Sequence, residues 1–210
     1  MENKHQVHNL IILDESGSME SIKKFIINGF NELIQTMKGI QKEFPEQEHF
    51  ISLISFNGIG KKILHFIDPV DKINEINSKT YNPDASTPLF DALGFAMNKL
   101  DQHLANLKDY NVLVSILTDG EENASKEYTK QMIRNMINER KERNWTFTYI
   151  GTEHDIESFA NDISISNHYT FSKTVNSVNS MFSKEKEARM RYSHKIRYNV
   201  DVNDKFYDED

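Results

Sequence analysis

Apolar residues along the chain follow two alternating patterns. The first consists of short runs of β-branched and aliphatic residues that are apolar on both faces, which is typical of strands buried inside a parallel sheet. These runs cover residues 7–13, 50–56, 62–67, 111–118 and 145–150. The last place where a further strand can end is near 170–174.

The second pattern places apolar residues three or four positions apart, as expected for amphipathic helices. One stretch has this spacing from Ile22 to Met37, and another has it from Leu89 to Leu104. The pattern also predicts helices over 128–143, shortly after Gly151, and from about Val175 onward. The alternation of strands and helices predicts an α/β fold, a Rossmann-like open, mostly parallel six-stranded sheet with helices on both faces.

One pair of strands departs from this alternation. The runs 50–56 and 62–67 are separated by a short segment with Gly58 and Gly60, which predicts a hairpin and an antiparallel edge strand. The same segment has a superficial likeness to a phosphate loop. That motif requires glycine where Ser55 stands and serine or threonine where Lys62 stands, so the nucleotide-binding interpretation is rejected.

Composition narrows the class of protein. The 210 residues include no cysteine, which excludes disulfides, thiolate metal sites and cysteine nucleophiles. The formal charge of -7 opposes binding to nucleic acid or to an anionic membrane, so a protein partner or a cation is expected. The apolar run before Asp14 is too short for a signal-peptide core or a membrane span. We expect a soluble cytoplasmic protein with one domain over 1–195 and an acidic, flexible C-terminal tail over 196–210.

Oxygen-bearing side chains gather where predicted elements meet. Asp14, Ser16 and Ser18 follow the first strand, Thr87 precedes a helix, and Asp119 follows the strand at 111–118. Each has a structural explanation, because these residue types also serve as helix caps and turn residues. Their places in the order of elements favour a functional explanation. Two groups follow the carboxyl ends of parallel strands and the third opens the helix between them, where open α/β sheets bind ligands.

The chemistry of this set indicates the kind of ligand. Two carboxylates and three hydroxyls make an all-oxygen set, which suits a hard cation and does not suit Zn²⁺ or Cu²⁺. Mg²⁺ is the expected ion, with Mn²⁺ and Ca²⁺ as alternatives. Glu121 and Glu122 are placed at the rim of such a site, and His5 and His8 are regarded as incidental.

Three motifs in this order resemble the von Willebrand factor A domain. They are Asp-x-Ser-x-Ser at 14–18, Ser-Thr-Pro-Leu-Phe-Asp-Ala-Leu at 86–93 and Leu-Thr-Asp-Gly-Glu-Glu-Asn at 117–123, and the resemblance covers about 5–185. It implies a complete metal-ion-dependent adhesion site. Ser16 and Ser18 would bind the cation directly, and Thr87, Asp14 and Asp119 directly or through water. Without cysteines the chain looks like the intracellular microbial branch of the family, so cell adhesion is not carried over.

Two functions of different classes are compatible with these residues. The preferred one is a noncatalytic, Mg²⁺-dependent protein-binding module in which an Asp or Glu of a partner protein completes the coordination of the metal. The alternative is a Mg²⁺-dependent phosphohydrolase with Asp14 as nucleophile. Such enzymes usually have a second aspartate two residues later, where this chain has Ser16.

Overall fold

A six-stranded sheet forms the centre of the protein in the computed structural model, which describes residues 4–152, 156–203 and 205–208. The strand order is β3-β2-β1-β4-β5-β6, and every neighbouring pair is parallel except β2 with β3. The strands are β1 (His5–Asp14), β2 (Gln47–Asn57), β3 (Gly60–Pro69), β4 (Tyr110–Leu117), β5 (Trp145–Thr152) and β6 (Asn167–Phe171). The predicted fold class is confirmed, including the antiparallel edge strand.

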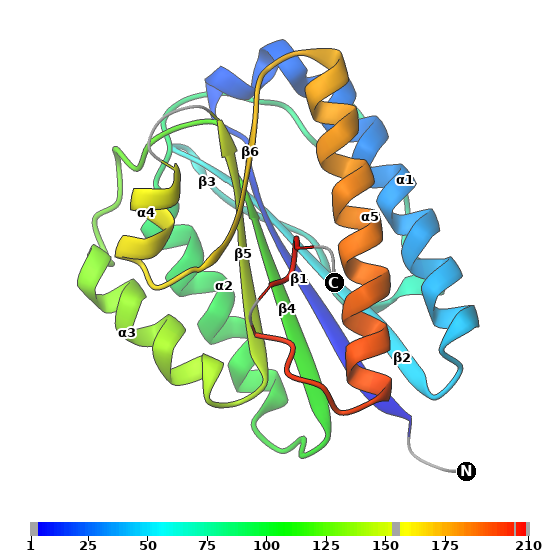
Figure 1. Ribbon diagram of the computed structural model, residues 1–210. Coiled ribbons are helices and arrows are strands. Elements are labelled where there is room, and N and C mark those ends of the chain that lie inside the picture. Colours follow the sequence, from blue (N-terminus) through cyan, green and yellow to red (C-terminus); the bar gives the residue numbers. More distant parts are fainter. Residues whose placement is uncertain (1–3, 153–155, 204, 209–210) are drawn as a thin grey trace.

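Helices cover both faces of this sheet (Figure 1). On one face lie α1 (Lys23–Glu43) and α5 (Val175–Arg197), and on the other lie α2 (Leu89–Leu104), α3 (Lys130–Lys141) and α4 (Ile156–Asp162). Two 3₁₀ segments, η1 (Gly17–Ile22) and η2 (Val70–Lys72), precede α1 and follow β3. None of the helices in the described ranges is long and apolar enough to cross a membrane.

The alternation of side chains along β1 explains why its sequence is apolar on both faces. Ile11 and Leu13 belong to the core beneath α1 and α5, whereas Leu10 and Ile12 belong to the core beneath α2 and α3. A central strand therefore contributes to two cores. This burial fixes the register of β1 and with it the position of Asp14 at the end of the strand.

The described part of the C-terminal segment, predicted from composition to be a flexible tail, includes buried residues. Helix α5 extends to Arg197, beyond the predicted boundary at 195. Val202, Phe206 and Tyr207 are then buried against the core beneath α1 and α5. Burial of these three apolar side chains favours packing of the described part of the segment, although its average composition is acidic. Glu209 and Asp210 lie outside the described residues.

Candidate metal centre

The first and third motifs meet at the carboxyl ends of two adjacent strands. Leu13 of β1 is paired with Leu117 of β4, so Asp14 and Thr118 leave the sheet side by side. The Thr118 hydroxyl donates a hydrogen bond of 2.6 Å to Oδ2 of Asp14. Parallel pairing thus places the aspartate of the first motif beside the loop that carries Asp119.

The turn after β1 directs its hydroxyl groups toward that loop. The Ser16 amide donates to Oδ1 of Asp14 at 2.7 Å, which closes the turn. Hydroxyl oxygens of Ser16 and Ser18 lie 3.1 Å apart, and the Ser18 hydroxyl donates to Oδ1 of Asp119 at 2.6 Å. Ser16 occupies the N-cap position of η1, but its side chain makes no capping hydrogen bond. The cap explanation for Ser16 is therefore wrong, and its hydroxyl lies with the other oxygens.

The second motif is held against the third by reciprocal hydrogen bonds. The backbone amide of Thr87 donates to the side-chain oxygen of Asn123 at 3.0 Å, and the backbone amide of Asn123 donates to the Thr87 carbonyl at 3.2 Å. Pro88 holds the N-cap position of α2, which begins at Leu89 and has no side-chain cap. Within the described part of the chain, the Thr87 hydroxyl makes no hydrogen bond, so its lone pairs are open to a ligand.

Gly120 shows how closely the three motifs converge. A Cβ atom on this residue would lie 3.1 Å from the Thr87 hydroxyl oxygen and 3.8 Å from both Asp14 Oδ2 and the Ser18 hydroxyl oxygen. The position of this Cβ, on the residue next to Asp119 in the third motif, thus has oxygens from the first and second motifs within 4 Å. The structure brings all five predicted side chains to one place.

The electrostatics of this place are those of a site built for positive charge. Burial raises the pKa of Asp14 to about 6, against hydrogen bonds from Thr118 and Ser16 that lower it, and the nearby Asp119 raises it further. The Asp119 side chain is also fully buried. Two buried carboxylates close together cost free energy that a cation would offset.

The oxygens of Asp119 have different neighbours. Oδ1 accepts the Ser18 hydroxyl, whereas Oδ2 has the ammonium nitrogen of Lys173 at 2.6 Å. Among the described residues, no three His, Asp or Glu side chains form a metal-binding cluster. Any cation held here therefore needs the serine and threonine hydroxyls. The all-oxygen donors present fit a hard divalent cation.

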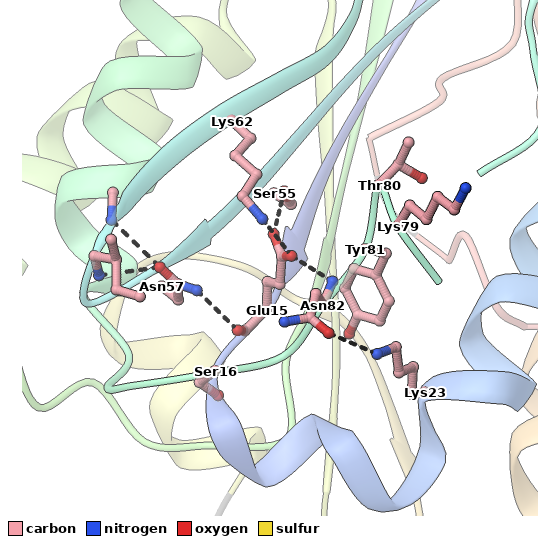
Figure 2. A network of polar contacts seen from close by, with 12 residues as sticks. Glu15, Ser16, Lys23, Ser55, Asn57, Lys62, Lys79, Thr80, Tyr81 and Asn82 are labelled. Carbon is pink, nitrogen blue, oxygen red and sulfur yellow. Dashed lines mark hydrogen bonds and ion pairs between the residues drawn. The ribbon is translucent and has the colours of Figure 1, made fainter. Parts of the chain in front are cut away.

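A buried network that no sequence pattern predicts surrounds Glu15, the residue between Asp14 and Ser16 (Figure 2). The Glu15 carboxylate accepts hydrogen bonds from the Ser55 hydroxyl at 2.6 Å and from the backbone amide of Asn82 at 2.5 Å. Nζ of Lys62 lies 2.6 Å from the same carboxylate. The network joins the turn after β1 to β2, β3 and the loop that leads to Thr87. No spacing rule indicates it, because its members are scattered along the chain.

The neighbouring acidic residues have separate roles. Glu122 accepts hydrogen bonds from the amides of Phe90, Ala124 and Ser125, so it holds the loop after β4 against α2. Glu121 lines a cavity of about 500 Å³ that opens beside Asp119. The apolar wall of this cavity is formed by Phe90, Tyr149, Ile156 and Phe159.

No observation favours the phosphohydrolase alternative. Both oxygens of Asp14 accept hydrogen bonds, and the side chain is fully buried. A carboxylate nucleophile has to be reached by the substrate, and the enclosed Asp14 side chain is not accessible from solvent. The histidines at the start of β1 lie at the opposite end of the strand, where His5 is paired with Asp109 at 2.6 Å.

Comparison with known proteins agrees with this geometry. The family model of the von Willebrand factor type A domain matches residues 10–186, and the chain belongs to this family. No match was found among curated protein sequences.

Solved structures with the same fold include proteins of several kinds. Proximal thread matrix protein 1 from the mussel byssus has a TM-score of 0.57 at 14% identity, and the match covers 89% of this chain and 47% of that one. This chain thus spans about half of the byssus protein, whose metal-ion-dependent adhesion site (MIDAS) is occupied by zinc in another structure.

Two bacterial pilus proteins have the same fold. The vWF domain of the type V pilus tip protein Mfa5 from Porphyromonas gingivalis has a TM-score of 0.56 at 12% identity. The match covers 88% of this chain and 96% of that one. The pilus adhesin SpaC from Lactobacillus rhamnosus GG has a TM-score of 0.60 at 11% identity, with 91% and 31% covered. At these identities the likeness shows the fold.

Proposed function

We propose that this chain is a noncatalytic, divalent-cation-dependent protein-binding module. Asp14, Ser16, Ser18, Thr87 and Asp119 hold Mg²⁺, with Mn²⁺ and Ca²⁺ as alternatives. The observation that carries the proposal is the convergence of all three motifs around Gly120, with hydroxyl oxygens of Thr87 and Ser18 and a carboxylate oxygen of Asp14 within 4 Å of one position. The family supports it, since the three motifs lie within the matched residues 10–186 and a byssus protein of the same fold holds zinc at its MIDAS.

The charge of the site indicates what completes it. Two aspartates balance the double charge of the cation, and the neutral hydroxyls fill further positions without adding negative charge. A bound ion therefore remains attractive to a carboxylate from outside. We propose that an Asp or Glu of a partner protein supplies this ligand. The assignment to the intracellular microbial branch and a cytoplasmic location, expected from the cysteine-free sequence, are parts of the same proposal.

Metal binding is the first test. Mg²⁺ or Mn²⁺ should bind with one ion per chain in a calorimetric titration and raise the melting temperature, because a ligand confined to the folded state stabilises it. Zn²⁺ belongs in the same titration because it occupies the MIDAS of the byssus protein. Asp14→Ala and Asp119→Ala should keep native circular dichroism and lose the metal response. A flat titration with the wild-type chain would contradict the proposal.

The partner ligand is tested separately. Proteins captured from a lysate by the wild-type chain in Mg²⁺ should be lost in the presence of chelator and lost with Thr87→Ala. Replacing the acidic residues of a captured protein one at a time by their amides should identify one whose loss abolishes binding. Capture that survives both chelator and Thr87→Ala would show that binding uses another surface.

A further inference from the structure

A lysine reaches into the candidate metal centre from a part of the chain outside the three motifs. Lys173 lies between β6 and α5, and its Nζ is 2.6 Å from Oδ2 of Asp119 and 3.4 Å from the carbonyl oxygen of Ser18. The Lys173 side chain is 37% exposed, whereas the Asp119 side chain is fully buried. The ammonium thus caps a buried carboxylate of the metal centre from the solvent side.

We propose that Lys173 is an internal counter-ion that competes with the divalent cation for Asp119. In the metal-free protein its single positive charge compensates one of the two buried carboxylates. A divalent cation held by the same carboxylate meets this ammonium as a like charge at close range, which opposes binding. Metal binding therefore requires the ammonium to leave Asp119. This inference rests on the proposed function of the site.

The competition links the metal to the partner. A group that draws Lys173 away from Asp119 strengthens metal binding. Because binding free energies are coupled reciprocally, the metal strengthens the binding of that group by the same factor. Lys173 is partly exposed and lies next to Thr174, the N-cap residue of α5, at the rim of the site. A partner's acidic group at the metal can pair with the displaced ammonium. Lys173 thus makes the cation and an acidic partner bind cooperatively.

A second lysine near the same edge of the sheet provides a matched control. Nζ of Lys130 lies 2.6 Å from Asp162, the same distance as in the Lys173 pair. Both side chains of this control pair are half exposed, and the Lys130 ammonium pairs with Asp162, which is not a candidate ligand. Replacing Lys130 changes the net charge of the chain by the same amount as replacing Lys173. The comparison separates a local effect at Asp119 from the general effect of charge.

The test is a calorimetric titration of the full chain with Mg²⁺ and with Mn²⁺. Lys173→Met should bind the ion roughly tenfold more tightly than wild type, within the usual range of coupling between sites. Lys130→Met should stay within about twofold, because its charge is screened by solvent. Lys173→Arg keeps the charge and should retain weak binding. If circular dichroism shows that Lys173→Met does not fold, Lys173→Gln takes its place.

The outcomes distinguish this inference from the proposed function. Tighter metal binding by Lys173→Met than by wild type, with Lys130→Met close to wild type, supports the inference. Equal or weaker binding by Lys173→Met, while wild type binds the ion, overturns the inference and leaves the proposed function intact. Absence of binding in every chain overturns both.

Discussion

Gly120 occupies the point where a side chain would obstruct the candidate metal centre. The nearest atom to a Cβ at this position is the Thr87 hydroxyl oxygen at 3.1 Å, a distance that forces one of the two to move. We predict that Gly120→Ala weakens Mg²⁺ binding about tenfold, since a misplaced ligand loses roughly 1.4 kcal/mol of ion binding. Calorimetric titration measures this change.

Gly39 provides the control for that substitution. It lies inside α1, where an added Cβ meets nothing within 4 Å. Gly39→Ala should leave the metal affinity unchanged and stabilise the chain by about 0.5–1 kcal/mol through helix propensity. Equal metal affinities for both alanine variants would show that the ligands do not close around Gly120.

At the residue scale the sequence predicts the candidate metal ligands better than it predicts the residues around them. Asp14, Ser16 and Asp119 stand in short motifs whose spacing is visible along the chain, and the structure brings them together. Lys173 is 54 positions after Asp119, in a connection with no motif, so only the three-dimensional fold shows their contact. Glu15 stands within a motif, but its partners come from other strands and loops.

At the scale of elements, Glu15 joins four segments through one buried carboxylate (Figure 2). Lys62 and the Asn82 amide contact Oε1, whereas the Ser55 hydroxyl donates to Oε2. A glutamine can reproduce this arrangement, because its oxygen can accept at the first position and its NH₂ group can donate to the serine. The network therefore depends more on the positive charge of Lys62 than on the negative charge of Glu15.

We predict that Lys62→Met destabilises the fold more than Glu15→Gln does. Lys62→Met leaves a buried carboxylate without its counter-ion and should cost about 1–3 kcal/mol, whereas Glu15→Gln should cost about 1 kcal/mol or less. In the double variant, Lys62→Met should add little, because no charge is left to compensate. Urea unfolding of the four chains measures these differences. Additive effects would show that the ion pair contributes nothing.

The sequence predicts the elements well because their signals are local. The strands are apolar on both faces because helices cover both sides of the sheet, and the helices have apolar residues every three to four positions because one face of each packs on the sheet. Element ends are less predictable. Helix α2 begins at Leu89 with Pro88 as its N-cap, whereas residue types alone favour Thr87 as the cap. Hydrogen bonds between Thr87 and Asn123 decide this end, and they come from a distant loop.

At the scale of the whole molecule, a buried polar network connects the sheet to α5 and the C-terminal segment. Arg189 of α5 pairs with Glu185 at 2.9 Å and donates to the side chains of Asn9 in β1 and Ser115 in β4. Tyr207 donates its hydroxyl to the other oxygen of Glu185 at 2.5 Å. Every charge in this network is compensated, as burial requires. The C-terminal segment therefore completes the network on the sheet face that α5 covers.

This network shows which contacts composition alone does not reveal in the segment that it predicts to be a flexible tail. Residues 196–210 are acidic and have no helical periodicity, which is typical of a solvated segment. Burying the aromatic ring of Phe206 or Tyr207 contributes about 1.5–3 kcal/mol to stability, which favours packing of the segment despite its polar average composition. A compositional average does not detect such isolated anchors.

We predict that Tyr207→Phe lowers the free energy of unfolding by about 1–3 kcal/mol, because the buried Glu185 carboxylate loses a hydrogen-bond donor. Burial and the Glu185 charge raise the pKa of Tyr207, which keeps its hydroxyl protonated and able to donate at neutral pH. Tyr198→Phe is the matched control, since Tyr198 is 61% exposed and the change removes the same oxygen. Urea unfolding at pH 7 should show a loss for Tyr207→Phe and no change for Tyr198→Phe. Equal stability of the two variants would mean that the C-terminal segment does not pack on α5 in solution.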